Sequence, residues 1–279
     1  MTPTGVARAL LAAALLPVVV VVVGGLGSAV LQSIGLMPLV GPVRFSFDAY
    51  VATAPNLASA IGISLAIAAT STTIAAVVGS AAALVVVSGG RAGRLVGVAG
   101  AVTISIPHLI GAATMGLLLA DSGVLPRLLG ISADAWPPLV GGPWWVAVIA
   151  EYAWKESAFV ALVVAGTLLT RVAQFDEPAA LLGAGRIARI RMIFLPLATP
   201  SLIVASTIVF VYTLGSYEVA WLLGRTYPEP LAVLAIRLFN DVNLTSRTES
   251  AAIAVVTVVA ALASVAIASL ALRRAAVWR

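Results

Sequence analysis

The sequence predicts an all-α membrane protein with six transmembrane helices, a prediction that rests on its composition and on the lengths of its apolar runs. Of the 279 residues, 61% are hydrophobic and 10% are charged, whereas soluble domains average about 45–50% apolar and about 25% charged residues. A bilayer core of about 30 Å needs about 20 apolar residues in one helix. Six runs meet this length: about 9–34, 57–87, 95–120, 144–170, 198–224 and 250–272.

We interpret residues 1–279 as a single transmembrane domain with one cytoplasmic loop at about 171–197. The first run follows Arg8, as the apolar core of a secretory signal follows its basic residues. However, it is longer than the usual 7–15 residues, and no small-x-small cleavage site follows a polar region. We therefore expect it to be a retained helix.

The distribution of arginines predicts that both termini face the cytoplasm. With the N-terminus inside, the inner segments hold ten arginines and the outer loops hold five. The inner ones are Arg8, Arg91, Arg94, Arg171, Arg186, Arg189, Arg191, Arg273, Arg274 and Arg279, and the outer ones are Arg44, Arg127, Arg225, Arg237 and Arg247. Such an inner excess is the usual orientation signal. It also explains the net charge of +5 without nucleic acid as a partner.

The residue types that support catalysis or metal binding are scarce. The chain has no cysteine, and His108 is its one histidine, so we expect no metal site with zinc-type spacing. Lys155 is the one lysine and no glycine-rich loop precedes it, which excludes the phosphate-binding G-x-x-x-x-G-K-[ST] motif. We therefore predict neither an enzyme nor a cofactor in this chain. If ATP is used, another subunit must bind it.

The stretch 177–196, EPAALLGAGRIARIRMIFLP, concentrates charge and glycine between two apolar runs. Glu177 and the preceding Asp176 favour the start of a short helix, and Pro178 suits its first turn. Gly183 tolerates the left-handed backbone that ends a helix. A basic stretch follows, so the pattern predicts a short helix, a glycine turn and a second, basic helix. Such an element is suited to docking a cytoplasmic partner, although its arginines alone would also suit anionic lipid.

The spacing of this loop resembles the EAA loop of ABC importer permeases, which has the pattern E-A-A-x-x-x-G-x9-I-x-L-P. The matching positions are Glu177, Ala179, Gly183, Ile193, Leu195 and Pro196. Pro178 stands where the family has an alanine, and this departure affects the first turn of the helix. The match covers 20 residues with strict spacing, in the cytoplasmic loop before the penultimate helix. In the family this loop forms the coupling helix that docks on the ATPase subunit.

The resemblance implies a permease subunit of a type I, binding-protein-dependent importer in the bacterial inner membrane. Its partners would be two ABC ATPase subunits, a second permease subunit and an extracytoplasmic substrate-binding protein. A heterodimer of permeases is expected over a homodimer. ATP and Mg²⁺ would be bound by the ATPase, and this chain would perform no covalent chemistry.

A second stretch, GSYEVAWLLGRTYPEPLAV at 215–233, is similar to the end of the fifth helix in permeases for polyamines, ferric iron, thiamine and phosphonates. Weaker similarity at YAWKESAFVALVVAGTLL, 152–169, extends the resemblance to about residues 55–260. We expect a polyamine as the substrate, with ferric iron, thiamine, a phosphonate or a sugar as alternatives.

Charged residues inside the apolar runs are the candidates for a translocation pathway, because an ion at membrane depth is costly. Glu218, beside Tyr217 in the outer third of the fifth run, would meet a cationic substrate, or else reach outward to water or Arg225. Glu151 and Lys155 are four residues apart and share a helix face. A structural ion pair is the favoured interpretation for them, and a pathway role is the alternative.

His108 follows Pro107 in the third run. It would shuttle protons or, the favoured interpretation, bind backbone carbonyls that the proline leaves without a donor. A self-sufficient protein is the remote alternative for the whole chain. An ion-coupled carrier would show inverted repeats, and a membrane hydrolase would show a nucleophile–base pair, but the sequence displays neither.

Overall fold

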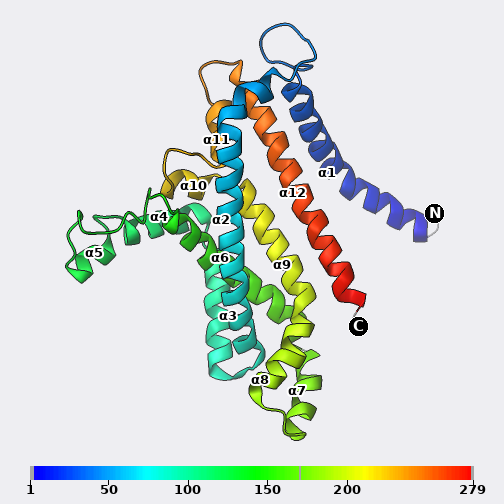
Figure 1. Ribbon diagram of the computed structural model, residues 1–279. Coiled ribbons are helices and arrows are strands. Elements are labelled where there is room, and N and C mark those ends of the chain that lie inside the picture. The colour runs from blue at the N-terminus through cyan, green and yellow to red at the C-terminus, as the bar shows by residue number, and fades with distance from the viewer. Residues whose placement is uncertain (1–2, 170, 278–279) are drawn as a thin grey trace.

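The computed structural model describes residues 3–169 and 171–277, and every regular element in these ranges is a helix (Figure 1). Within them, five stretches are long and apolar enough to cross a membrane. These are Leu10–Ser33, Asp48–Val87, His108–Leu129, Arg186–Gly215 and Ser246–Arg274. The fourth predicted run forms a helix of 23 residues, α6, but it carries three charged residues. The predicted fold class is confirmed.

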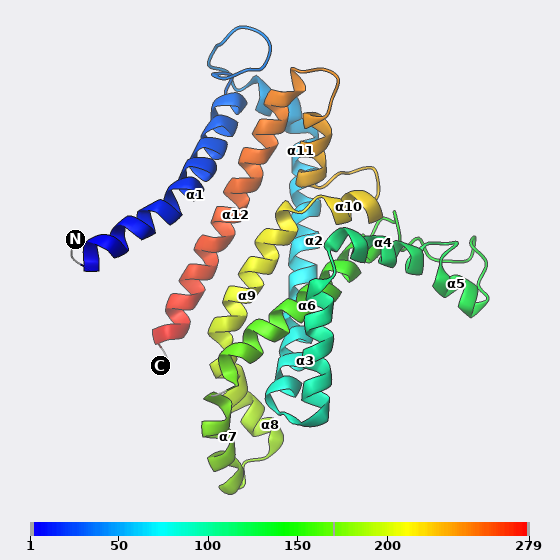
Figure 2. The same cartoon turned by 180° about the vertical axis from the view of Figure 1, so that it is seen from behind.

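Long helices form the bundle, and short ones lie at its ends and side (Figures 1 and 2). The long ones are α1 (Pro3–Ser33), α2 (Asp48–Val87), α3 (Gly90–Ser105), α6 (Val146–Leu168), α9 (Leu195–Gly215) and α12 (Ser246–Val277). The shorter ones are α4 (His108–Leu119), α5 (Val124–Leu129), α7 (Arg171–Leu181), α8 (Arg186–Arg189), α10 (Glu218–Leu223) and α11 (Leu231–Phe239).

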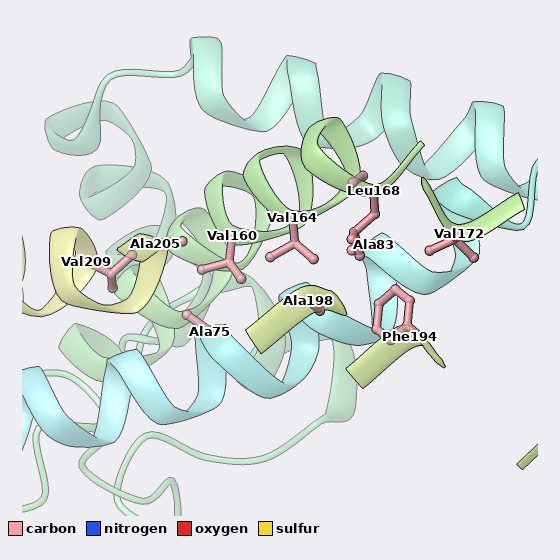
Figure 3. Packing of buried hydrophobic residues seen from close by; sticks show 11 residues of the cluster. Ala75, Ala83, Val160, Val164, Leu168, Val172, Phe194, Ala198, Ala205 and Val209 are labelled. Atoms are coloured by element: carbon pink, nitrogen blue, oxygen red, sulfur yellow. The ribbon is translucent and has the colours of Figure 1, made fainter. Parts of the chain in front are cut away.

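The core of the bundle is the crossing of α2 and α6. A Cβ on Gly79 of α2 would lie 2.6 Å from Cβ of Val160 in α6, so only glycine permits this approach. Helices in a lipid bilayer have no hydrophobic driving force for association, so they depend on close packing, which small residues permit. Figure 3 shows the buried cluster that continues from this crossing to α9, with Ala75 of α2 near Val160 and Ala205 of α9 near Val209.

The third and fifth predicted runs are not single helices. The third divides into α3 and α4, because Pro107 has no backbone N–H to continue the ladder and Ile106 is extended (ψ 124°). The fifth divides into α9 and α10 at Ser216, which is also extended (ψ 134°). Gly215, a poor helix former, ends α9. After the breaks, α4 and α10 leave the bundle on the same side (Figures 1 and 2) and pack on each other.

The predicted outer loop that contains α5 extends from the side of the bundle, whereas two segments predicted to be cytoplasmic lie together at one end of the molecule (Figures 1 and 2). The turn between α2 and α3 and the helices α7 and α8 occupy this end, whereas loop 34–47 and α11 occupy the other (Figures 1 and 2). At that other end, the hydroxyl of Tyr50 in α2 donates to Oγ of Ser33 in α1 at 2.9 Å. The remainder of α1 diverges from the bundle, and Pro17 lies inside it.

Candidate functional site: a protruding hairpin and a buried polar cluster

The stretch 171–195 forms a helical hairpin that protrudes beyond the bundle (Figure 1). Its two arms are α7 and α8, and a five-residue π-helix (Ile190–Phe194) joins α8 to α9. A helix, a turn and a short basic helix were predicted in this order, and the structure has them in this order. We call this element the coupling hairpin, after the family loop that its sequence spacing resembles.

One detail of the prediction is wrong. The first arm does not start at Asp176 and Glu177 with Pro178 in its first turn; it starts at Arg171 and encloses Pro178. The reason is the burial of Val172, which packs in the core against Phe194. With this contact, the helix begins five residues before its predicted start.

The turn of the coupling hairpin depends on a glycine, as predicted. Gly183 has φ +83°, in the left-handed region, whereas Gly185 has φ −65°. Beside this turn, the side chains of Leu181 and Leu182 are 89% and 88% exposed. Large apolar side chains so fully exposed at a tip indicate a contact with another molecule.

The other motif residues lie along both arms and at the base. Glu177 is exposed, and Ala179 and Ile193 are half-buried. Leu195 and Pro196 are exposed and begin α9. The motif therefore does not converge on one point of the surface: it specifies the hairpin's shape and its junction with α9.

Two oppositely charged side chains join the arms. Arg189 of α8 forms an ion pair with Asp176 of α7. Next to them lies a cavity of about 240 Å³, whose floor includes Leu84 and Val87 from the end of α2. The sequence pattern gave no indication of this pair, because the two residues are 13 positions apart and on different helices.

A second site lies at the break between α3 and α4. Lys155 of α6 is only 4% exposed, and its Nζ donates hydrogen bonds to the carbonyl oxygens of Thr103, at 3.1 Å, and of Ile106. In an unbroken helix, the N–H at position 107 would bind the Thr103 carbonyl, but Pro107 has none. The Thr103 carbonyl accepts the N–H of Ile106 at 3.2 Å instead, so the lysine adds a second donor there. It also supplies the donor to the Ile106 carbonyl and places a cation at the negative end of α3.

Two carboxylates of α6 contact His108, the first residue of α4. Oε1 of Glu151 lies 3.2 Å from Nδ1 of His108, and Oε1 of Glu156 lies 3.4 Å from Nε2. The ring of Tyr212 in α9 lies against the histidine, with centroids 4.9 Å apart. The contact with Glu151 has hydrogen-bond geometry, whereas the contact with Glu156 is within ion-pair distance only. We call Glu151, Lys155, Glu156 and His108 the polar cluster.

The predicted ion pair between Glu151 and Lys155 is not formed. The helix places both residues at the break in α3–α4, but they bind different partners there. Glu151 faces His108, and Lys155 faces the free carbonyls. The favoured role of His108 is also wrong, because Lys155 rather than His108 binds those carbonyls. Pro107 was the correct indication of an irregularity.

Close packing holds α4 against this cluster. A Cβ on Gly111 of α4 would lie 2.8 Å from Oε1 of Glu151. Glu151 is fully buried, and its Oε2 has no hydrogen-bond partner among the described residues. On the other side, His108, Glu156 and Tyr212 line a cavity of about 240 Å³ together with Ile104, Lys155, Phe159 and Ile208.

Glu218 and Tyr217 lie at the second break. Glu218 is half-buried and is the first residue of α10 rather than part of a continuous fifth helix. Among the described residues it forms no ion pair with Arg225 within 4 Å. The rings of Tyr217 and Trp221 are tilted against each other with centroids 6.1 Å apart, and Tyr217 lines a separate cavity of about 430 Å³. Since α10 packs on both α4 and α6, the two breaks lie in one region of the bundle.

Comparison with known proteins gives matches to solved structures. A bacterial alginate ABC transporter, solved in complex with alginate pentasaccharide-bound periplasmic protein, contains a chain with TM-score 0.74 and 22% identity, covering 95% of this chain and 94% of that one. A second structure of a bacterial ABC transporter that imports the acidic polysaccharide alginate gives 0.74, 21% identity and 95% of both chains. An amino acid ABC transporter with histidines gives 0.59, 20% identity, 83% of this chain and 99% of that one. No protein-family model and no curated protein matches the sequence. This chain therefore has the fold of chains in ABC transporters.

Proposed function

We propose that this chain is a permease subunit of an ATP-binding-cassette importer and forms half of a translocation pathway across the bacterial inner membrane. One observation carries the proposal. The coupling hairpin has the spacing of the EAA loop and protrudes from a fold that chains of ABC transporters share.

The tip of the coupling hairpin has the chemistry of a docking element. Leu181 and Leu182 contact little of their own chain, and complete burial of one leucine side chain contributes about 1.5–3 kcal/mol. In the proposed complex an apolar groove on a separate ATPase subunit covers them. ATP and Mg²⁺ belong to that subunit, and this chain supplies the mechanical connection rather than a reacting group.

The base of the coupling hairpin connects docking to the bundle. Val172 and Phe194 are buried together with Ala83 of α2, Leu168 of α6 and Ala198 of α9 (Figure 3). A displacement of the hairpin by the ATPase is therefore applied directly to three long helices. Closure of two ATPases would in this way favour the outward-open state, which the loaded binding protein must favour as well.

The remaining partners follow from the same proposal. The arginine distribution supports cytoplasmic termini, with the coupling hairpin inside and loop 34–47 and α11 outside. The outer end would contact an extracytoplasmic binding protein. A second permease subunit, different from this chain, would complete the pathway. Exposed arginines of the coupling hairpin suit anionic lipid headgroups as well.

For the substrate we propose a small organic cation of the polyamine type. The stretch 215–233 resembles polyamine permeases, and Glu151, Glu156 and Glu218 bring three carboxylates to the region of the two breaks. Ferric iron, thiamine, phosphonate or sugar permeases are the alternatives within the same role. Uptake of radiolabelled spermidine by the Glu218→Gln variant tests the role of Glu218. A cation pathway past Glu218 requires reduced uptake, and unchanged uptake would remove Glu218 from the pathway.

The central test is affinity purification of this chain from its native membrane in mild detergent, followed by mass spectrometry. An ABC ATPase and a second permease should accompany the wild type. The double variant Leu181→Asp with Leu182→Asp should lose the ATPase and retain the permease. Val242→Asp is a matched control, because Val242 is 98% exposed and lies between α11 and α12, at the opposite end of the molecule from the hairpin. Recovery of the chain alone, even after cross-linking, would overturn the proposal.

A further inference from the structure

We infer that Asp176 and Arg189 are positioning residues, whose ion pair fixes the angle between the arms of the coupling hairpin and makes the hairpin move as one body. This inference rests on the proposed function, since it assigns the pair a role in transmitting motion from the ATPase. The EAA spacing itself contains neither residue.

The location of the pair divides the coupling hairpin into three levels. Val172 and Phe194 anchor the base in the core at 8% and 3% exposure. The ion pair crosses between the arms above the base. Beyond it, the tip has no comparable anchor, and Leu181 is almost fully exposed. The ion pair is thus the outermost connection between the arms that the structure describes.

The pair is also better placed than its neighbours to hold the arms. The side chain of Arg189 is 25% exposed and that of Asp176 is 37% exposed, so solvent screens their attraction less than that of a fully exposed pair. Arg186 and Arg191 of the same segment form no ion pair among the described residues. Arg189 is therefore the arginine of this segment that acts on the other arm.

The backbone that follows explains why such a connection is needed. The π-helix Ile190–Phe194 begins immediately after Arg189. Helical segments of this wider type are rare and are found mostly at functional sites. Force applied at the tip reaches α9 through this segment. Without the cross-connection, the second arm would turn at the π-helix, and the displacement of the tip would be lost before it reached α9.

The first experiment measures the angle without any partner. The chain has no native cysteine, so spin labels at Leu181→Cys and Ala92→Cys report the distance from the tip to α3. In lipid nanodiscs, pulsed EPR should give a narrow distance distribution for the parent, a broad one for Arg189→Gln, and a narrow one again for the charge swap Asp176→Arg with Arg189→Asp. Arg191→Gln removes the same charge from the same segment and should leave the distribution narrow.

The second experiment measures coupling in the complete complex in proteoliposomes. Arg189→Gln should retain the ATPase on purification but transport less radiolabelled spermidine per ATP hydrolysed than the wild type. The charge swap should restore this ratio, and Arg191→Gln should not change it.

Two outcomes overturn the inference while leaving the proposed function intact: an unchanged distance distribution in Arg189→Gln, or a charge swap that is as uncoupled as Arg189→Gln. A wild-type chain that captures no ATPase would instead overturn the proposed function, whatever the EPR result.

Discussion

Replacing Lys155 by methionine should strongly destabilise the protein, because it removes the donor that completes the broken end of α3. Lys155 Nζ makes two hydrogen bonds to carbonyl oxygens, those of Thr103 and Ile106. A hydrogen bond to a charged group contributes about 1.5–3 kcal/mol. The substitution removes the charge itself and leaves neutral carbonyl acceptors, and a buried acceptor left unsatisfied costs about 1–3 kcal/mol. We therefore expect a loss of about 3–5 kcal/mol.

The assay is thermal unfolding in detergent at a fixed scan rate, followed by size-exclusion chromatography of the surviving protein. For chains of roughly this size, 1 kcal/mol corresponds to about 2–4 °C in Tm, so Lys155→Met should lower the apparent Tm by roughly 10 °C. Arg94→Gln is the matched control: it removes one positive charge from α3 itself, at an exposed position, and should change Tm by less than about 2 °C.

A result equal to the control would refute the reasoning, since it would mean that the carbonyls at the break are satisfied without the lysine. A second variant tests the cause. Pro107→Ala restores a backbone N–H where the ladder is interrupted. In the Lys155→Met background it should recover part of the lost Tm. Further destabilisation by this second change would show that the break, and not the missing donor, determines stability here.

Two further predictions concern single residues. Gly183→Ala should cost about 1–2 kcal/mol of stability, because an L-residue is strained at φ +83°. It should also reduce capture of the ATPase in the affinity purification, whereas Gly185→Ala, at φ −65°, should not. Equal capture by both variants would contradict the role of the turn. Ser64→Ala should lower stability by about 1 kcal/mol, because Oγ of Ser64 accepts a hydrogen bond from the backbone N–H of Leu231 at 2.8 Å and caps α11. The hydroxyl of Ser59 binds only its own helix, so Ser59→Ala should leave the unfolding temperature unchanged. A similar shift in both variants would argue against the cap.

Features encoded by neighbouring residues could be predicted from the sequence. The length of the apolar runs predicts the long helices, since the bilayer sets the number of residues. The left-handed turn at Gly183 is predicted by residue type, because glycine lacks the Cβ that makes this backbone costly. The order helix, turn and basic helix in the coupling hairpin follows from the same local chemistry.

Features that depend on distant residues could not be predicted. The nearest charged residue on the helix face of Glu151 is Lys155, so spacing predicts a pair between them. The actual partner of Glu151 is 43 positions away, and Lys155 binds carbonyls 49 and 52 positions away. Hydropathy fails at the breaks for a related reason. Ile104, Ile106 and Leu109 keep the third run apolar on average across Pro107, so the run continues while the backbone does not.

The close approach of α2 and α6 at Gly79 limits how this molecule can change shape. A Cβ there would meet Val160 Cβ at 2.6 Å and the carbonyl oxygen of Ser157 at 2.8 Å, so the two helix backbones are interlocked with no room for sliding. Interiors packed in this way switch between discrete arrangements and do not deform gradually. We expect α2 and α6 to travel as a single rigid frame. Any opening and closing then falls to the elements that do not share this interlock, first of all α4 and α10, which leave the frame at the two breaks.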